Sequence, residues 1–327
     1  MKLSVAVCTY NGAKYIEEEL LSIVNQRVAV DEIVICDDYS TDGTLDVVKN
    51  FVSSYEGRKI AWRICENTVR LGVTKNFEKA IKLCTGDLIF LADQDDVWFD
   101  DKTEVIVDYF LHNKHTEVVF SDSALIDGYG MLLTDYTLFD AIGMSFVKGM
   151  WKAGMGIEIF NVTSNKVTGC TLALKKTFCG SLFPFDENLL HDYQIAIKAV
   201  SQGVIDCVDK SLMKYRLHEN NVVGLRNSWI FNKKAFDERG FLSILEPVPA
   251  RTIFYQYVNG EDNRLLKERL DFLNLRSRCI QSWVGRIRLL LQIPAYIRLY
   301  RKYSFYILVH DILYGKIPYT KFMLPTL

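Results

Sequence analysis

Three carboxylates follow a short apolar run in the segment GDLIFLADQDDVWFD, residues 86–100. Residues 88–92 are all apolar but too few for a convincing helix, so they predict a buried strand that runs into Asp93, Asp95 and Asp96. Hard divalent cations prefer oxygen ligands, and Mg²⁺ is usually held by one or two carboxylates together with substrate phosphates. The Asp-x-Asp spacing at a strand end therefore predicts a divalent-cation site, with a solvated acidic turn as the alternative.

The strand that carries these acids belongs to a regular alternation of elements. Apolar strands are predicted at 3–7, 33–36, 60–64 and 88–92, and helical spacing is found at 13–24, 45–52 and 76–84. Alternation of this kind predicts parallel strands joined by right-handed crossovers, with helices on both faces of the sheet. The strands end in polar segments at 9–11, 37–42, 67–72 and 93–96. Because ligands of open α/β sheets bind outside the carboxyl ends of the strands, these segments are expected to line one crevice.

Glycine-rich phosphate loops are missing from the sequence. No GxGxxG follows the first strand, and GxxxxGK[ST] occurs nowhere. The phosphates of a ligand would then be bound through a metal rather than by backbone amides, which again indicates the aspartates.

Composition limits the class of protein. The 327 residues are 49% hydrophobic and 24% charged, which is typical of a globular protein, and the length predicts one large domain with an appendage. A net charge of −1 gives no general attraction to nucleic acid. Eight cysteines without a CxxC pair indicate reduced thiols. A strand that begins at once leaves no room for a signal peptide, and no apolar run reaches the ~18–20 residues of a membrane span. These features predict a cytoplasmic location.

Seven motifs in order resemble a known family. SVAVCTYNG, IVICDDYSTDGT, NTVRLGVTKNFEKAI and GDLIFLADQDDVW resemble the nucleotide-sugar half of family 2 glycosyltransferases of the GT-A fold. VTGCTLAL, LLHDYQIAI and YRLHENNVVG resemble the acceptor half of the rhamnosyltransferase-like branch. The resemblance covers about residues 3–225. It implies a Rossmann-like, mostly parallel sheet flanked by helices, and an inverting, metal-dependent transfer of a sugar from a nucleoside diphosphate to a hydroxyl.

On the donor side, the resemblance assigns Asp38 to accept a hydrogen bond from the N–H of a uracil or thymine ring. It places Thr9, Tyr10 and Asn11 around the same nucleoside and Arg70 near the nucleotide. The alternative for Asp38 is a turn that caps the next helix, and the alternative for Arg70 is a solvated side chain.

For the metal, the resemblance assigns Asp95 to direct coordination of Mn²⁺ or Mg²⁺ and Asp93 to the ribose or the metal shell. Asp96 is expected to make local hydrogen bonds. His218 is assigned as a metal ligand or diphosphate contact, with Arg216 as a weaker candidate, because imidazole suits Mn²⁺-type sites. A structural histidine is the alternative. A bound cation would lower the cost of holding these carboxylates together.

On the acceptor side, the resemblance assigns Asp192 as the general base and His191 as the residue that orients or flanks it. Asp192 also stands in the first turn of a predicted helix, where an acid is favourable for that reason alone. Gly169, Cys170 and Thr171 are expected to bring the backbone close to the acceptor.

The predicted domains are a GT-A catalytic domain at 1–226, with a nucleotide-sugar half at about 1–100 and an acceptor half at about 101–226, and a helical C-terminal extension at 227–327. Residues 128–165 are expected to form a mobile acceptor-side loop. The extension has basic residues interleaved among Leu, Ile, Trp and Tyr. Such helices can lie on an anionic membrane surface, here the cytoplasmic face of the inner membrane. The alternatives are a helical subdomain packed on the core and an oligomer contact.

The sequence thus predicts a bacterial-type transferase of surface polysaccharide synthesis. Its donor would be dTDP-rhamnose or a UDP-sugar, and its acceptor a glycan or lipid-linked glycan. One alternative is a catalytically silent sugar-nucleotide-binding or scaffold protein of the same fold. A third interpretation, a nucleotidyltransferase, would typically need a basic glycine-rich loop after the first strand, and CTYNG is not basic.

Overall fold

The computed structural model describes residues 1–55, 59–142, 144–145, 148, 151, 165–187, 189–218, 271–272, 275–276, 278–279, 282–300, 308–309 and 312. The chain divides into two compact units, one of residues 1–139 with 167–231 and the other of residues 140–166 with 232–327. All candidate site residues lie in the first unit.

The first unit alternates strands and helices along its N-terminal part, as predicted. Its strands are β1 Leu3–Thr9, β2 Glu32–Asp37, β3 Ala61–Glu66, β4 Leu88–Asp93, β5 Val97–Trp98, β6 Val118–Ile126, β7 Leu132–Thr137, β8 Leu172–Lys175 and β9 Ile205–Arg216. Its helices are α1 Ile16–Val24, α2 Thr44–Ser54, α3 Val73–Leu83, α4 Lys102–His112, α8 Lys176–Cys179 and α9 His191–Gln202, with a 3-10 turn η1 at Gly169–Thr171. Helix α5, Leu138–Ala141, begins where this unit ends.

The nine described strands form one sheet in the order β3-β2-β1-β4-β8-β6-β9-β5, with β7 paired to β6. Strands β1 to β4 are parallel throughout, which confirms the arrangement predicted for the nucleotide-sugar half. Strand β8 then runs antiparallel between β4 and β6, and β9 is parallel to β6. The fold is α/β as predicted, and its second half makes the complete sheet mixed.

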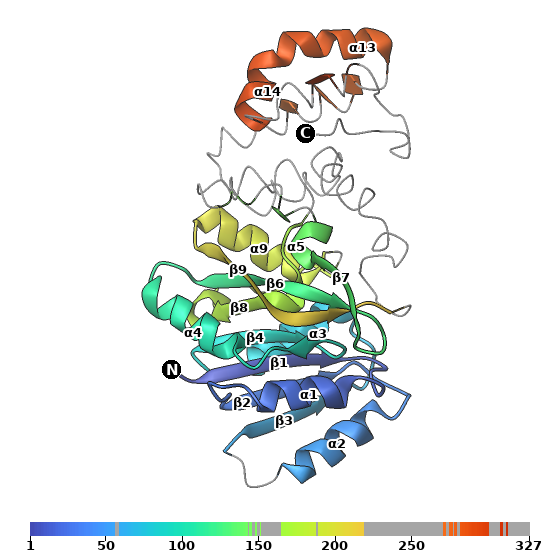
Figure 1. Cartoon of the computed structure of the whole chain (residues 1–327), viewed down its shortest axis with the longest axis vertical. Helices are drawn as coiled ribbons and strands as arrows, with labels where there is room; N and C mark the ends of the chain where they lie inside the picture. The colour runs from blue at the N-terminus through green and yellow to red at the C-terminus, as the bar shows by residue number, and fades with distance from the viewer. Residues whose placement is uncertain are drawn as a thin grey trace. The chain divides into compact units, whose positions relative to one another are not determined.

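The register of the parallel strands brings their carboxyl ends to one edge. Cys8 in β1 pairs with Asp93 in β4, so the acidic loop begins level with the end of β1. Val5, Ile35 and Phe90, in the middle of β1, β2 and β4, are fully buried. Figure 1 shows α1 and α2 on one face of the sheet and α3 on the other. Coverage of both faces explains why these strands are continuously apolar in sequence rather than alternating.

Strand β6 is longer than its sequence indicated. The apolar run 118–120 and the polar residues Ser121, Asp122 and Ser123 after it predict a strand that ends near 120, whereas β6 continues through Ile126. The polar side chain of Asp122 is paired inside the fold, because its carboxylate accepts hydrogen bonds from the backbone amides of Ser123 and Phe139 at 2.7 and 2.8 Å. A satisfied acid can therefore lie within the strand.

Two further expectations for the acceptor half are corrected. The sequence predicts only a short strand that ends at 215–218, whereas β9 is 12 residues long, because it pairs with β6 along most of its length and with β5 near its end. Residues 132–141 form β7 and α5 rather than part of a mobile loop, since β7 pairs with β6. Most of the remaining predicted loop lies outside the described residues.

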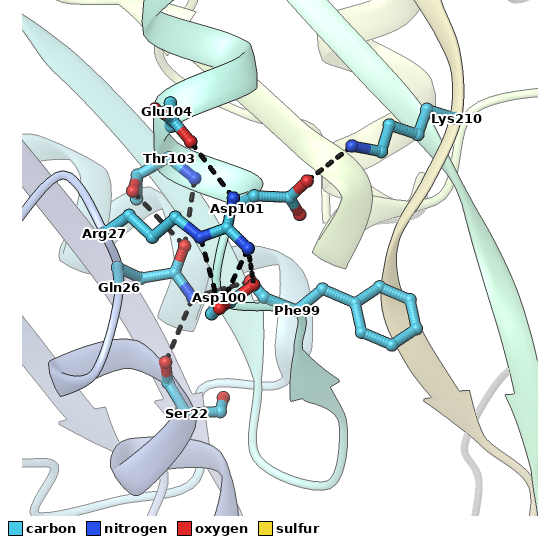
Figure 2. Close-up of polar contacts among 9 residues, drawn as sticks. All are labelled: Ser22, Gln26, Arg27, Phe99, Asp100, Asp101, Thr103, Glu104 and Lys210. Carbon is cyan, nitrogen blue, oxygen red and sulfur yellow. Dashed lines mark hydrogen bonds and ion pairs between the residues drawn. The ribbon is translucent and has the colours of Figure 1, made fainter.

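Polar contacts tie the start of α4 to the end of α1 (Figure 2). Gln26 donates a hydrogen bond to the Phe99 carbonyl at 2.8 Å and accepts one from the backbone amide of Thr103 at 3.0 Å. Arg27 forms an exposed ion pair with Asp100 at 3.1 Å. These contacts hold the segment that leads from β5 into α4.

The second unit contains the described helical segments α13 Trp283–Arg288, η3 Leu289–Gln292 and α14 Ile293–Tyr300. Most of the helical extension predicted for 227–327 lies outside the described residues. In the part of the chain that the structure describes, no helix has the length and apolarity needed to cross a bilayer.

Candidate active site

The turn after β2 is built on the buried side chain of Asp37. Its carboxylate accepts hydrogen bonds from the Thr9 hydroxyl at 2.7 Å and from the backbone amide and hydroxyl of Ser40 at 2.8 and 2.6 Å. Thr9, expected beside the nucleoside, is itself 2% exposed. Its side chain therefore supports the turn that surrounds the candidate nucleoside site.

Asp38 holds a second loop at the same edge. Its Oδ1 accepts hydrogen bonds from the Asn67 side chain at 2.9 Å and the Leu71 amide at 2.6 Å, and its Oδ2 accepts one from the Gly72 amide at 2.8 Å. A carboxylate has about four acceptor positions, so one position on Oδ2 is left by these three bonds. The loop that Asp38 holds is the one that carries Arg70.

Tyr10 and Arg70, both predicted near the nucleotide, lie in contact. The Arg70 guanidinium carbon is 3.9 Å from the centre of the Tyr10 ring, a cation–π arrangement. Gln94 fixes Tyr10, since its side-chain amide accepts from the Tyr10 N–H at 2.8 Å and donates to the Tyr10 carbonyl at 3.0 Å. A Cβ on Gly12 would lie 2.1 Å from Gln94 Oε1, so a larger residue at position 12 would displace the Gln94 side chain from these bonds.

Asn11 shapes the turn next to Tyr10. Its side-chain oxygen accepts a hydrogen bond from the Thr41 amide at 2.9 Å, and its φ of 49° lies in the left-handed region that asparagine tolerates better than most residues. Asn11 is exposed, so it stands at the rim of the candidate nucleoside site.

Asp95 and His218, both assigned to the metal, meet although 123 residues separate them. Asp95 Oδ2 and His218 Nε2 lie 2.7 Å apart, and the two side chains are 14% and 13% exposed. Asp95 belongs to the loop after β4, and His218 follows the end of β9. The structure therefore brings together the two residues that the sequence assigned to the metal.

A polar cluster, buried at Asp96 and Cys170 and half-buried at Asp93, lies beside this pair. The ligand atoms of Asp93, Asp96 and Cys170 lie within 4.8 Å of one another. Burial and repulsion from neighbouring carboxylates raise the pKa of Asp93 well above its ordinary value, and the same causes raise the pKa of Asp96 to about 7. Burial also raises the pKa of the Cys170 thiol, which stays protonated and acts as a hydrogen-bond donor toward Asp96.

Two charged residues behind the acidic loop were missed by sequence reasoning. Lys102 is 1% exposed, and its Nζ donates to the Cys170 carbonyl at 2.9 Å and lies 3.9 Å from the centre of the Trp98 ring. Burial lowers the pKa of Lys102 to about 8 and raises the pKa of Glu19 well above its ordinary value. The sequence did indicate that both residues are buried, because each falls at the i, i+4 spacing of the apolar face of its helix.

Asp192 lies in the first turn of α9, which is anchored to α3 by a hydrogen bond from the Thr74 hydroxyl to the Leu189 carbonyl at 2.8 Å. It is 9% exposed, and burial raises its pKa to about 7, while hydrogen bonds from the backbone amides of Tyr193 and Gly169 limit the rise. Repulsion from Asp192 contributes to the raised pKa of Asp93, so the two acids lie near each other.

His191 packs beneath this acid and is not exposed to solvent. Its ring stacks on Phe77 of α3 with centroids 4.0 Å apart, and burial lowers its pKa to about 3, so the imidazole is neutral. Neither ring nitrogen has a hydrogen-bond partner among the described residues. A Cβ on Gly169 would lie 2.6 Å from His191 Nε2, so the backbone of η1 approaches the ring at a distance that only glycine allows. Cys170 and Thr171, the other two residues of η1, are buried as well.

The donor set fits a divalent cation. Asp95 supplies a carboxylate oxygen and His218 an imidazole nitrogen, which are ligands that Mn²⁺ accepts. Burial is the largest cause of the raised pKa of Asp93, and repulsion from neighbouring carboxylates adds to it; a bound cation would relieve that repulsion. Cys170 is a poor ligand for such a hard cation while its thiol is protonated.

Comparison with known proteins agrees with this geometry. The family model described as "Glycosyl transferase family 2" matches residues 4–166. The chain is 30% identical over 245 residues to dTDP-rhamnosyl transferase RfbG of Shigella flexneri, which covers 68% of this chain and 75% of that protein. It is 24% identical over 260 residues to the putative teichuronic acid biosynthesis glycosyltransferase TuaG of Bacillus subtilis (strain 168), covering 79% and 95%.

Solved structures share the fold at lower identity. TarS 1-349 of S. aureus, in complex with UDP-GlcNAc, has a TM-score of 0.51 at 18% identity, covering 95% of this chain and 89% of that chain. Mannosyltransferase PcManGT from Pyrobaculum calidifontis, in complex with GDP-Man and Mn²⁺, has a TM-score of 0.50 at 18% identity, covering 97% and 88%. These likenesses establish the GT-A fold. Together with the family match and the relative at 30% identity, they show that the chain belongs to glycosyl transferase family 2 and is a glycosyltransferase.

Proposed function

We propose that this enzyme transfers a hexosyl group, with inversion, from a nucleoside diphosphate sugar to a hydroxyl of a glycan or lipid-linked glycan. The observation that carries the proposal is the meeting of Asp95 and His218 at one edge of the sheet, with Asp192 close enough to raise the pKa of Asp93. Candidate metal ligands and a candidate base thus lie around one place, which is what transfer between a diphosphate and a hydroxyl requires.

The donor nucleoside is proposed to bind between the turn after β1 and the loop held by Asp38. Tyr10 and Arg70 form one wall, and Asn11 stands at the rim. The remaining acceptor position on Asp38 Oδ2 suits the N–H of a thymine or uracil ring. The relative named as a dTDP-rhamnosyl transferase favours dTDP-rhamnose as the first donor to test, with UDP-sugars second.

Asp95 and His218 are proposed to hold a divalent cation, with Asp93 in its shell. When bound, such a cation supplies positive charge that stabilises the departing diphosphate. Asp192 takes the proton of the acceptor hydroxyl as that oxygen attacks the anomeric carbon. The amides of Gly169 and Tyr193 hold its carboxylate in place, and a pKa of about 7 lets it accept a proton near neutral pH.

A membrane surface is proposed as a further partner of the second unit. Its described helices expose large apolar side chains, each at least 41% exposed: Trp283, Val284, Ile287, Leu290, Leu291, Ile293 and Ile297. Arg286 and Arg288 lie among them, and the sequence has no acidic residue from Phe272 to His310. Apolar side chains interleaved with arginine match an interfacial segment on anionic lipid.

Ligand-dependent stability tests the donor and metal assignments. A ligand that binds only the folded state raises the Tm, so dTDP-rhamnose or a UDP-sugar should raise it more with Mn²⁺ than with EDTA. Asp95→Ala should abolish the difference between Mn²⁺ and EDTA. Transfer should likewise stop in EDTA and return with Mn²⁺ or Mg²⁺, and full turnover in thorough chelation would refute the metal assignment.

Activity separates an enzyme from the silent alternative. Wild-type protein that binds a sugar nucleotide should also release the nucleoside diphosphate, slowly with water and faster with a glycan acceptor. Binding without release, across the acceptors tried, would favour a sugar-nucleotide-binding role.

A further inference from the structure

We infer that Arg216 is a positioning residue for the pair Asp95–His218. The inference rests on the proposed function in one respect, that this pair binds a divalent cation. Arg216 ends β9, two residues before His218, and its side chain is 1% exposed. The sequence left open a contact between Arg216 and a diphosphate. At this depth its guanidinium faces the protein, so its role has to be read from its protein contacts.

Arg216 contacts the acidic loop twice. Its backbone N–H donates to Asp96 Oδ1 at 3.0 Å, and its side-chain Nε donates to the backbone carbonyl of Asp95 at 2.7 Å. The backbone bond would persist after most substitutions at this position, whereas the Nε bond depends on the guanidinium. Because the carbonyl and carboxylate belong to the same residue, the Nε bond fixes the direction in which the Asp95 side chain leaves the loop.

The other end of the guanidinium is anchored to α1. Nη2 donates to Glu18 Oε2 at 2.6 Å, and the guanidinium carbon lies 4.7 Å from the centre of the Tyr15 ring. The Tyr15 ring in turn lies 5.1 Å from the ring of His218. One planar group therefore braces both members of the pair, Asp95 through its main chain and His218 through Tyr15.

Lysine cannot substitute for this brace. The guanidinium directs Nε toward the Asp95 carbonyl and Nη2 toward the Glu18 carboxylate in a fixed plane, whereas an ammonium is a single point on a flexible stem. Groups that orient metal ligands typically change metal affinity by about 10- to 100-fold when they are mutated. Loss of the brace is therefore expected to weaken Mn²⁺ binding by about that factor, while nucleoside contacts near Tyr10 remain.

The test measures Mn²⁺ binding directly, from the electron paramagnetic resonance signal of free Mn²⁺ in the presence of UDP or dTDP, whichever raises the Tm of the wild-type protein. Arg216→Lys and Arg216→Met remove the brace. Glu18→Ala removes its distal anchor, and because the Glu18 side chain is 53% exposed this variant is expected to fold. Glu18→Gln keeps an acceptor oxygen for Nη2. The matched control is Arg27→Met, which breaks an exposed ion pair at the other end of α1 (Figure 2).

Both Arg216 variants should bind Mn²⁺ about 10- to 100-fold more weakly than wild type. Glu18→Ala should show a smaller loss, with Glu18→Gln and Arg27→Met close to wild type. Metal-free Tm should be unchanged in Glu18→Gln and Arg27→Met and lower in Glu18→Ala, which leaves Nη2 of the buried Arg216 without its carboxylate. If the Arg216 variants fail to fold, Glu18→Ala against Glu18→Gln decides the question.

Wild-type Mn²⁺ affinity in folded Arg216→Lys and Glu18→Ala would overturn the inference and leave the proposed metal site standing. An equal loss in Arg27→Met would also overturn it, since the effect would then be a general loosening of α1. Wild-type protein that binds no Mn²⁺ would overturn the metal assignment itself, and this inference with it.

Discussion

Asp192 combines burial with the need to carry a charge. An ordinary aspartate has a pKa of 3.8, and burial raises the pKa of this one to about 7. At that value the carboxyl group can take a proton and release it again near neutral pH, which is the requirement for a general base. The burial that suits Asp192 to its proposed role as a base also makes its ionisation costly, so its ionisation should raise activity and lower stability.

Asp192→Asn is expected to lower kcat by about 10²–10⁴-fold, because the side chain keeps its shape and an acceptor oxygen but loses the basic group. Donor binding should be retained, since the nucleoside contacts lie elsewhere. Initial rates and donor-dependent Tm shifts measure the two effects separately. A folded variant with near wild-type kcat would contradict the assignment.

The pH dependence of the wild type follows from the same pKa. The base must be ionised, so kcat/KM should rise with pH through about 7 and then level. For stability the sign is reversed. Between the unfolded value of 3.8 and about 7, the folded protein keeps a proton that the unfolded chain has lost, so this group lowers stability as pH rises through that window. Asp192→Asn should therefore have a higher Tm than wild type at pH 8 and an equal Tm near pH 4, as measured by thermal unfolding.

Gly169→Ala should reduce activity without touching the acid itself. The added Cβ would lie 2.6 Å from His191 Nε2, and Gly169 donates its amide to Asp192, so displacement of either group shifts the base. We expect a fall in kcat with unchanged donor affinity. Gly180→Ala is the control, since its Cβ would meet the Thr177 carbonyl only at 3.8 Å. Equal kcat in the two variants would show that the close approach at Gly169 has no part in placing Asp192.

At the scale of elements, Gln94 joins two loops that the sequence does not connect. Gln94→Glu replaces the amide that donates to the Tyr10 carbonyl with an acceptor, and the two oxygens then repel each other. The loss of one hydrogen bond is worth about 0.5–1.5 kcal/mol, so nucleoside diphosphate should bind roughly two- to tenfold more weakly. Isothermal titration with UDP or dTDP measures this, with Asp100→Asn as a control in the neighbouring segment. Wild-type affinity in Gln94→Glu would show that Tyr10 does not depend on this clamp.

The elements that could be predicted from the sequence are those with one regular pattern of apolar residues. Strands β1, β2 and β4 are continuous apolar runs because helices cover both faces, and the helices between them show regular spacing. The sequence predicts too short a strand β6, because Ser121, Asp122 and Ser123 are typical of a strand end. Only the fold shows that the Asp122 carboxylate accepts a hydrogen bond from the Phe139 amide. Antiparallel insertion of β8 was also not predicted, since nothing in its four residues specifies the strands beside which it lies.

At the scale of the whole molecule, the arginines on the described helices of the second unit allow a test of the proposed membrane binding. Changing Arg286 and Arg288 to glutamine should weaken binding to phosphatidylglycerol-containing liposomes by roughly 30-fold, at about 1 kcal/mol for each arginine near the surface. Intact protein should also be released as salt rises. Tyr129→Ser, which removes a 90% exposed aromatic side chain from the first unit, is the control for general surface apolarity. Intact protein that ignores these liposomes at low salt would refute the membrane proposal.

The candidate site shows where sequence reasoning reaches its limit. The motifs placed Asp95, His218 and Asp192 in three segments, and the structure brings these segments to one edge of the sheet. Sequence reasoning did not identify Gln94 or the brace at Arg216, because each acts through contacts that exist only after distant strands have packed. Thr9 has a supporting position for the same reason, since its partner Asp37 comes from the neighbouring strand.

The contacts of the proposed metal pair, Asp95 and His218, join residues 121 and 123 positions apart, which bears on how the protein is made. Synthesis runs from the N-terminus, and contacts across long stretches of chain form late because closing a long loop is entropically costly. A nascent chain of about 200 residues holds β1 to β4 and the turns for the nucleoside, but neither Arg216 nor His218, and its β5 lacks the partner strand β9. The proposed nucleoside site can therefore be assembled during translation, whereas the proposed metal pair is completed only after β9 has left the ribosome.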